Sequence, residues 1–338
     1  MNWEVQTMPS KTSFCNGTEF RKCLSRWWPL WVIYGVILFI MLPGVLLNAR
    51  STIPYVSAEQ SSYLSNVILS ETQMLLPLTA FCAGLLAAAA MFGYLYTPRG
   101  AGLAASLPIR RGCMFRTHLL AGLLMLLSAE AVIFGLAVLI EATRFELVIE
   151  PLLIWLGILA LETVVFYGIA VLCAMFTALV AVCSQIAIPM PWGVPINLAL
   201  FAVYMAGTML GPVWGAASQL VYLLLAAVGV PVMAGMQGGP AVLLGKTGGY
   251  AIGYLLAALI AGAFAAKLPH KFGWLALGCV VGCAACYVLG TIWFMVLTGL
   301  DLPTSLTYCV IPYLPGDVIK IALASLLTIQ LDKRMPKI

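Results

Sequence analysis

The sequence predicts an all-α, polytopic integral membrane protein, a helical bundle of about nine or ten spans. Hydrophobic residues make up 63% of the 338 residues and charged residues only 9%, whereas charged residues account for about a quarter of a soluble globular domain. Apolar runs that are long enough to cross a bilayer as helices recur along the whole chain. We expect no cleavable signal peptide, because residues 1–26 are polar and mildly basic and the first long apolar run starts at Trp27.

Basic residues indicate which loops face the cytoplasm. The net charge of +5 comes from Lys and Arg residues that cluster in short loops and tails. This pattern is typical of a cytoplasmic rim and not of a nucleic-acid-binding surface. The basic stretches 11–26, 98–117, 267–271 and 333–337 are therefore expected inside, which predicts that the N- and C-termini are both cytoplasmic.

The first half of the chain predicts three spans separated by polar loops. The spans cover about residues 28–47, 73–96 and 117–140. The loop between the first two spans, 48–72, carries Tyr, Ser and Glu residues and is expected outside, as is the acidic loop 141–150.

Residues 151–188 pose a topological problem. If the acidic loop before them and the Pro-rich loop after them both lie outside, this stretch must cross the membrane twice or not at all. Two tight spans would fit its length, although it holds no charged turn and only Gly168 to break a helix. The alternative is one long helix, with an inverted or strained N-terminal half.

The second half predicts five further spans and three outer loops. The spans cover about residues 196–210, 213–229, 251–266, 272–297 and 317–331. The outer loops are the Pro-rich stretch 189–195, the Gly-rich stretch 235–240 and residues 298–315, because the basic turn and tail belong inside. All three loops are therefore expected to converge around the start of the last span.

Asp317 and Lys320 are the leading candidates for a binding site. Pro315-Gly316 precedes them, so the last helix is expected to begin near Asp317, which places the acid and the base on one helical face. Ionisable groups at membrane depth are costly and usually face a protected polar cavity. The alternative is that Asp317 caps the helix and Lys320 extends its ammonium group to the membrane interface.

Three cysteines share one face of the span 272–297. Cys279, Cys283 and Cys286 have the spacing of possible metal ligands, but Gly278 and Gly282 stand beside them. Small residues at this density are typical of close helix packing in membranes, so we interpret the cysteines as packing residues and predict no metal site.

The remaining His and Glu residues in or near the apolar runs do not form a recognisable catalytic site. His118 and His270 lie in basic stretches without a ligand-spaced partner, so they are interpreted as loop residues. Glu130 and Glu162 could pair or line a path, but we favour protonated packing residues because no cation lies within sequence reach. No nucleophile is spaced with a base, and we therefore predict that the protein is not an enzyme.

Gly245-Lys246-Thr247 invites comparison with the end of a Walker A phosphate-binding loop, but the match fails. The first Gly of that motif is missing from its position, where Pro240-Ala241 stands instead. No strand is expected before the motif, and the helix after it is membrane-apolar. We therefore expect no nucleotide site.

Two stretches of the first half carry a family resemblance. One runs from Tyr94-Leu95-Tyr96 to Leu107-Pro108-Ile109-Arg110-Arg111, and the other is Phe166-Tyr167-Gly168 through Phe176-Thr177. They resemble type-2 ABC exporter permease subunits of Gram-positive bacteria. The resemblance implies a permease-like transmembrane fragment over 1–170, and with it an alternative function: the membrane subunit of an ABC-type exporter with an accessory C-terminal half.

The second half carries a longer, ordered series of motifs. They include Leu210-Gly211-Pro212-Val213-Trp214-Gly215, Gly245-Lys246-Thr247-Gly248-Gly249-Tyr250, Gly290-Thr291-Ile292-Trp293 and Leu314-Pro315-Gly316-Asp317-Val318-Ile319-Lys320. Over about residues 171–338 the chain resembles the BioY family, the substrate-binding membrane subunits of energy-coupling-factor biotin uptake systems. The resemblance implies a six-helix bundle that captures biotin under its outer loops, with no cofactor, in the cytoplasmic membrane of a bacterium.

The resemblance also implies which residues contact biotin. Asp317 and Lys320 fall on the acid and base of the family's terminal motif, and Gln237 falls where members can carry an Asn in the Gly-rich loop. Tyr250 and Trp293 are candidate apolar walls, with interfacial anchoring as the alternative for each. We expect Asp317 to accept a hydrogen bond from a ureido N–H, while Lys320 could serve either the ureido carbonyl or the carboxylate of biotin.

Two more implications concern partners and a departure from the family. Driven uptake in these systems requires separate ATPase subunits and a transmembrane coupling subunit. Ala174 and Ala178 match the small-residue face that docks on that coupling subunit, with ordinary helix packing as the alternative. Lys246 stands where members usually have Pro, which puts the binding affinity in question.

Overall fold

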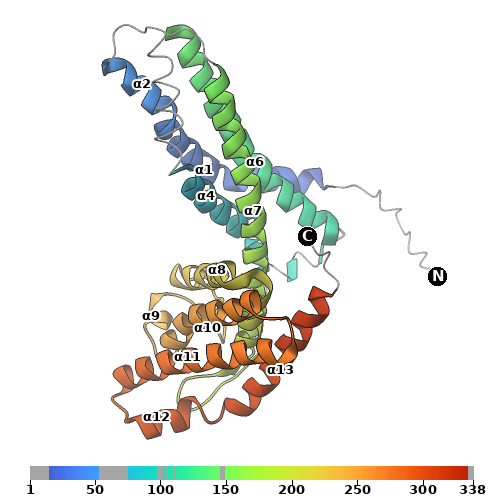
Figure 1. Cartoon of the computed structure of the whole chain (residues 1–338), viewed down its shortest axis with the longest axis vertical. Coiled ribbons are helices and arrows are strands. Elements are labelled where there is room, and N and C mark those ends of the chain that lie inside the picture. Colours follow the sequence, from blue (N-terminus) through green and yellow to red (C-terminus); the bar gives the residue numbers. More distant parts are fainter. Residues whose placement is uncertain are drawn as a thin grey trace, which may run out of the picture. The chain divides into compact units, whose positions relative to one another are not determined.

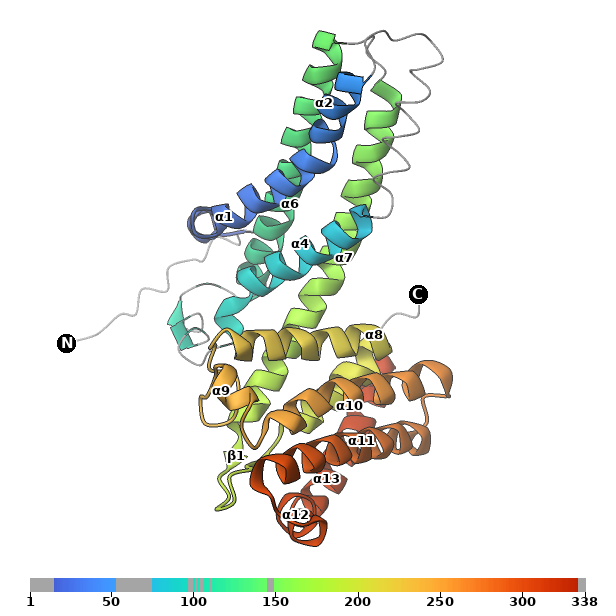
Figure 2. The same cartoon turned by 90° about the vertical axis from the view of Figure 1, so that its left-hand side faces the viewer.

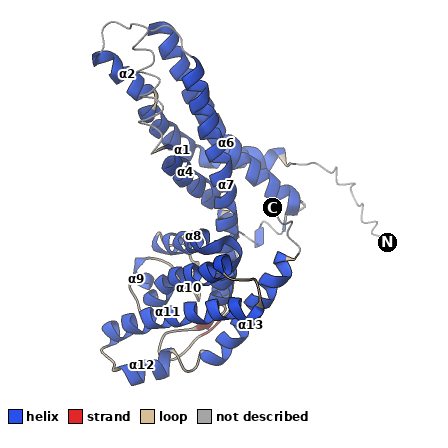
Figure 3. Ribbon diagram, viewed as in Figure 1, coloured by secondary structure: helices blue, strands red, loops and turns tan. Residues whose placement is uncertain are grey.

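The computed structural model describes residues 15–52, 75–96, 100, 102–103, 106–107, 109, 111–144 and 149–333. The described residues are almost all helical (Figure 3). Among them, seven helical stretches are long and apolar enough to cross a membrane. They are Gly17–Leu47, Arg111–Thr143, Ile149–Gln185, Ala199–Ala227, Gly248–Lys267, Phe272–Thr298 and Leu314–Asp332. The prediction of an all-α, polytopic membrane protein is confirmed.

The number of spans depends on how two elements are counted. Helix α4 (Leu76–Met91) is apolar but shorter than the seven. Helix α8 (Ala199–Ala227) contains a kink at Gly211, where φ is 81° and Pro212 follows. Pro212 has no N–H to continue the helical hydrogen bonds, so α8 consists of two segments. The expected spans 196–210 and 213–229 correspond to these segments.

The described residues fall into two compact units (Figures 1 and 2). The first unit takes its described residues from Met1–Met91 and Ala105–Tyr167, and the second takes them from Phe92–Ala104 and Gly168–Ile338. Helix α7 (Ile149–Gln185) contributes its first part to one unit and its second part to the other.

Helix α7 decides between the two readings of residues 151–188. It is one uninterrupted helix of 37 residues, so of the two alternatives left open by the sequence the single long helix is correct and the two tight spans are excluded. The physical reason is that Gly168 lowers helix propensity by only about 1 kcal/mol relative to Ala, and no Pro or polar turn interrupts the run.

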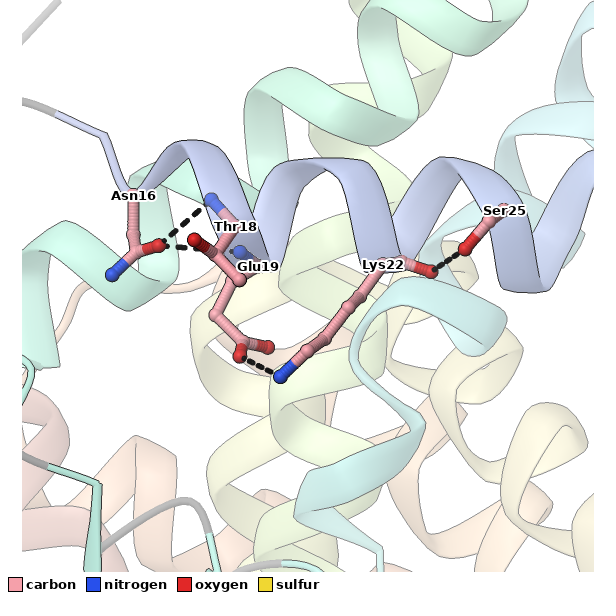
Figure 4. Close-up of polar contacts among 5 residues, drawn as sticks. All are labelled: Asn16, Thr18, Glu19, Lys22 and Ser25. Atoms are coloured by element: carbon pink, nitrogen blue, oxygen red, sulfur yellow. Dashed lines mark hydrogen bonds and ion pairs between the residues drawn. The ribbon is translucent and has the colours of Figure 1, made fainter.

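The first unit begins with helix α1 (Gly17–Met41), which has a well-formed N-terminus. Asn16 caps it, because its Oδ1 atom accepts hydrogen bonds from the N–H groups of Thr18 at 3.0 Å and Glu19 at 3.2 Å (Figure 4). Glu19 also pairs with Lys22 across one turn at 2.8 Å. Asn is among the best N-cap residues, and an acid in the first turn suits the positive end of the helix dipole.

The remaining elements of the first unit are α2 (Pro43–Thr52), α4 and α6 (Arg111–Arg144), together with the start of α7. Glu130 of α6 is buried and accepts hydrogen bonds from Tyr34 of α1 at 3.0 Å and from Thr163 of α7 at 2.6 Å. Its other oxygen has no hydrogen-bond partner among the described residues. Glu130 therefore joins three helices, which fits a packing residue better than a residue that lines a path.

One histidine prediction is wrong and the other is correct. His118 lies inside α6 and is buried, with Nδ1 at 2.9 Å from the carbonyl oxygen of Met114. The expected loop is absent there because α6 begins already at Arg111, within the basic stretch. His270 does lie in the turn between α10 (Gly248–Lys267) and α11 (Phe272–Thr298), where its ring contacts Asp332 at 3.2 Å.

The second unit is built around α8, α10 and α11, which lie side by side (Figures 1 and 2). The end of α7 and α13 (Leu314–Asp332) complete it, so that counting α8 as two segments gives a bundle of six. Two short strands, β1 (Ala187–Ile188) and β2 (Ile196–Asn197), pair antiparallel and turn the Pro-rich loop into a hairpin. The short helix α12 (Leu302–Cys309) lies within the predicted outer loop 298–315, and α9 (Pro240–Leu243) begins at the last residue of the predicted loop 235–240.

Candidate functional site

A cavity of about 630 Å³ lies in the second unit. Its lining comes from the β1–β2 hairpin, from residues 233–247, from α10 and α11, and from the start of α13. All three loops that were expected to converge near the start of the last span contribute to it, so that expectation is confirmed. A space of this size and mixed polarity is typical of a site for one small molecule.

Asp317 and Lys320 form an ion pair that faces this cavity. Asp317 is 2% exposed and Lys320 is 7% exposed, and the Lys320 Nζ atom lies 2.8 Å from the Asp317 Oδ1 atom. Burying two charges costs several kcal/mol per ion before their attraction offsets it, so the pair needs further partners.

The helix that carries this pair starts earlier than predicted. Helix α13 begins at Leu314 and not near Asp317, because Pro315 suits the first turn, where its missing N–H is not needed. Asp317 lies one turn inside the helix, and its N-terminus has no side-chain cap bond. Both alternatives, a capping Asp317 and a Lys320 at the membrane interface, are therefore wrong.

Helix α11 supplies two further donors to Asp317. The Tyr287 hydroxyl group donates a hydrogen bond to the Oδ2 atom, and the Cys283 thiol donates to the same oxygen at 3.8 Å. Tyr287 and Cys286 also line the cavity. Sequence reasoning missed Tyr287 and interpreted Cys283 as packing only. The available signal was their spacing, which places both side chains on one face of α11.

We predict that Tyr287→Phe lowers the free energy of unfolding by about 1.5–3 kcal/mol, the usual contribution of a hydrogen bond to a charged group. The substitution removes only the hydroxyl group that donates a hydrogen bond to Asp317. Unfolding of the detergent-solubilised protein, followed by circular dichroism, measures the change. Tyr308→Phe is the matched control, because the Tyr308 ring stacks on Trp192 and would be kept. An unfolding midpoint of Tyr287→Phe equal to that of the control would contradict the prediction.

Gln237 lies on the exposed side of the cavity in a loop that is held from α7. Its backbone pairs with Met233, with N–O distances of 3.0 and 3.3 Å. Gln185, at the end of α7, donates to the carbonyl oxygens of Val232 and Met233 and accepts from the N–H of Met236 at 2.9 Å. Met236 has a positive φ of 58°, which is uncommon for a residue other than Gly, and the hydrogen bonds from the Gln185 amide help to hold this conformation.

Tyr250 forms part of the cavity wall from α10. It is buried, and its hydroxyl group lies 3.3 Å from the Thr291 Oγ1 atom. Its ring meets the Tyr287 ring edge-on, with centroids 6.3 Å apart. Gly290 makes room for it, because a Cβ atom there would lie 2.2 Å from the Tyr250 ring.

Trp293 is not among the residues that line the cavity. Its Nε1–H group donates to the carbonyl oxygen of Gly245 at 3.0 Å, and its side chain fills the space left by Gly249. Trp293 therefore fixes the loop that leads into α10, one layer behind the cavity. Sequence reasoning left two roles open for Trp293, a wall of the site or an interfacial anchor, because side-chain direction on an apolar helix is not visible in the sequence.

Ala174 and Ala178 are both buried, 2% and 7% exposed. Their neighbours on α7 pack inside the second unit: the Cys173 thiol donates to the carbonyl oxygen of Trp214 at 3.5 Å, and the Thr177 hydroxyl to that of Ser218 at 2.8 Å. As the helix stands, neither alanine presents its methyl group to another molecule.

The hairpin is tied to the loop before α13. Trp192 stacks on Tyr308 of α12 with ring centroids 5.6 Å apart, and its Nε1–H donates to the Tyr313 hydroxyl at 3.1 Å. Tyr313 in turn donates to the carbonyl oxygen of Val194.

Within the described part of the chain, no group of three His, Cys, Asp or Glu side chains is arranged to hold a metal ion. The cavity therefore offers a buried ion pair, an amide and aromatic walls.

Comparison with known proteins gives one consistent result for the second half. A sequence model of the BioY family matches residues 160–337. The chain is 35% identical over 159 residues to "Biotin transporter BioY" of Thermotoga maritima, covering 47% of this chain and 92% of that protein. It is 36% identical over 161 residues to "Probable biotin transporter BioY" of Pyrococcus horikoshii, covering 48% of this chain and 94% of that protein.

One solved structure matches about half of the chain. It is the crystal structure of "the S-component for biotin from an ECF-type ABC transporter", which is 31% identical to this chain. The alignment covers 49% of this chain and 91% of that one, with a TM-score of 0.46.

Proposed function

Since this chain belongs to the BioY family, we propose that its cavity binds biotin and that the protein takes up biotin as the substrate-specific subunit of an energy-coupling-factor transporter. The observation that carries the proposal is the buried Asp317–Lys320 pair at the cavity wall. The protein is then a transporter and not an enzyme. The family match leaves residues 1–159 aside, and the alternative of an exporter subunit gains no support from it.

The chemistry of biotin fits the groups that line the cavity. Its ureido ring has two N–H donors and a carbonyl acceptor, and its apolar chain ends in a carboxylate. Asp317 would accept from a ureido N–H at its Oδ1 atom, which has a second lone pair beside the one that Lys320 uses, whereas Tyr287 and Cys283 both donate to Oδ2. Gln237 supplies an amide that can donate or accept, and the Tyr250 ring covers apolar surface.

The proposed partners are separate ATPase subunits and a transmembrane coupling subunit in the cytoplasmic membrane of a bacterium. The orientation with both termini in the cytoplasm is part of the proposal; residues 1–14 and 334–338 lie outside the described residues. For Ala174 and Ala178, burial of both side chains argues against direct contact with the coupling subunit. On the same helix the exposed side chains are Leu172, Met175 and Leu179.

Binding of radiolabelled biotin to the purified full chain tests the proposal directly. We expect saturable binding that approaches one biotin per chain. Unlabelled biotin should compete, whereas thiamine, a vitamin without a ureido ring, should not. If biotin does not bind in detergent or in lipid nanodiscs, the proposed function is wrong.

We predict that Gln237→Ala weakens biotin binding about five- to tenfold, because one neutral hydrogen bond contributes about 0.5–1.5 kcal/mol. Its side chain lies at the exposed edge of the cavity, so the fold should tolerate the change. Gln330→Ala on the exposed face of α13 is the matched control, because Gln330 does not line the cavity. Equal affinities of the two variants would exclude Gln237 as a ligand.

A further inference from the structure

Lys246 occupies an unusual place in the cavity. It lies on the loop between α9 and α10, is exposed to solvent, and still lines the cavity. Its Cδ atom lies 3.5 Å from the point where a Cβ on Gly193 of the hairpin would stand. The side chain therefore extends from one outer loop toward another, at the open side of the cavity.

The loop that presents Lys246 is firmly anchored. Trp293 holds the Gly245 carbonyl oxygen at 3.0 Å, and the same oxygen accepts from the N–H of Gly248 at 3.0 Å. A side chain at Gly248 would meet the carbonyl oxygen of Leu243 at 1.6 Å, so the backbone there is closely packed. The ammonium group is thus carried by a fixed backbone on a flexible side chain.

The charges that line the cavity do not balance. Among the described residues that line it, the Asp, Glu, Lys and Arg side chains are Asp317, Lys320 and Lys246, and the first two neutralise each other at 2.8 Å. Lys246 takes part in none of the ion pairs found among the described residues. The residues that line the cavity therefore carry a net charge of about +1, which favours a ligand with one negative charge.

A ligand carboxylate fits poorly at the buried pair. Placed against Lys320, it would lie next to the carboxylate of Asp317, and both of these side chains are buried. Two carboxylates that share a buried site repel each other, and one of them must take up a proton. An uncharged ring with N–H donors and a carbonyl acceptor meets no such penalty there.

We propose that Lys246 binds the carboxylate of the ligand, so that biotin enters ring first and its acid group stays at the mouth of the cavity. This inference rests on the proposed function and deepens it, since it makes Lys246 the residue that selects a free acid over its neutral derivatives. Lys320 is then left to donate to the ureido carbonyl, and the open choice between its two possible partners is decided.

Equilibrium binding of two ligands to four proteins tests the inference. The ligands are biotin and biotinamide, which carries an uncharged amide in place of the carboxylate. The proteins are the wild type, Lys246→Gln, Lys246→Arg and Lys271→Gln. Lys271 is an exposed lysine that does not line the cavity, so the last variant controls for loss of a surface charge.

We expect Lys246→Gln to bind biotin about five- to tenfold more weakly than the wild type, as for a partly exposed charge-assisted hydrogen bond. Its affinity for biotinamide should equal that of the wild type. Lys246→Arg should restore most of the preference for biotin, and Lys271→Gln should change neither affinity. The preference of the wild type should also shrink with added salt, because exposed charges are screened.

Three results would overturn the inference. If the wild type binds no biotin, the proposed function fails and Lys246 with it. If the wild type binds biotin and Lys246→Gln binds it equally well, the proposed function stands and the role of Lys246 is wrong. If Lys246→Gln weakens the binding of biotin and of biotinamide by the same factor, Lys246 only supports its loop.

Discussion

Asp317→Asn and Lys320→Met should each weaken biotin binding about a hundredfold. Each change removes one charged partner of the ligand and leaves the other charge buried without its counter-ion. A buried charged hydrogen-bond partner contributes a few kcal/mol, and 2.8 kcal/mol corresponds to about a hundredfold in affinity. Binding of labelled biotin to each purified variant measures the effect.

The same changes should also destabilise the unliganded protein, which complicates the measurement. Breaking a buried ion pair by removal of one partner costs about 3–5 kcal/mol, whereas replacing both partners with uncharged side chains of similar size is often neutral. We therefore expect the double variant Asp317→Asn/Lys320→Met to unfold near the midpoint of the wild type. Its biotin affinity should remain at least a hundredfold lower.

This double variant separates the two roles of the pair. A stable double variant that fails to bind biotin shows that the charges serve the ligand and not only the fold. A double variant that binds biotin like the wild type would refute the site, and so would single variants that both keep wild-type affinity. Retention of the far-ultraviolet circular dichroism spectrum confirms that each protein compared is folded.

The sequence was sufficient for the parts of the site that depend on charge and on loop order. Asp317 and Lys320 stand out in an apolar chain because ionisable residues are rare at membrane depth. The order of basic and polar loops placed the hairpin, the Gly-rich loop and the loop before α13 on one side, and residues from all three line the cavity. These inferences need only composition and helix length.

The parts that failed depend on side-chain direction and on small differences in helix stability. Helix α11 is apolar on every face, so the spacing of its residues does not show which face meets Asp317. Tyr287 points to Asp317, while Trp293 points to the loop behind. Likewise, a single Gly168 neither breaks α7 nor stops it, whereas Gly211 before Pro212 divides α8. The sequence shows where a break is possible, and only packing decides whether it occurs.

The close approach of α8 and α10 gives the second large expected effect, because glycines stand at the crossing. A Cβ atom on Gly262 of α10 would lie 2.6 Å from the backbone of Gly211 and Pro212 in α8. A Cβ atom on Gly207 of α8 would lie 2.4 Å from the carbonyl oxygen of Ala258 in α10. Both clashes are with backbone atoms, which cannot turn aside as a flexible side chain could.

Gly262→Ala should therefore destabilise the protein by about 3 kcal/mol, at the upper end of the usual cost of overpacking, and Gly262→Leu should prevent folding of the second unit. The direction of the change in stability is informative. In a helix, replacing Gly by Ala ordinarily stabilises by about 0.5–1 kcal/mol, since Gly loses more backbone freedom on folding. A loss of stability at Gly262 must then come from the lost contact between helices.

Gly273→Ala is the control that isolates this contact. Gly273 lies in the first turn of α11, and a Cβ atom there would meet nothing within 4 Å. Its unfolding midpoint should be equal to or slightly above that of the wild type, while that of Gly262→Ala falls. Because α10 also carries Tyr250 and the loop with Lys246, biotin binding should be lost together with folding in Gly262→Leu. If Gly262→Ala were as stable as Gly273→Ala, α8 and α10 would not cross at this distance.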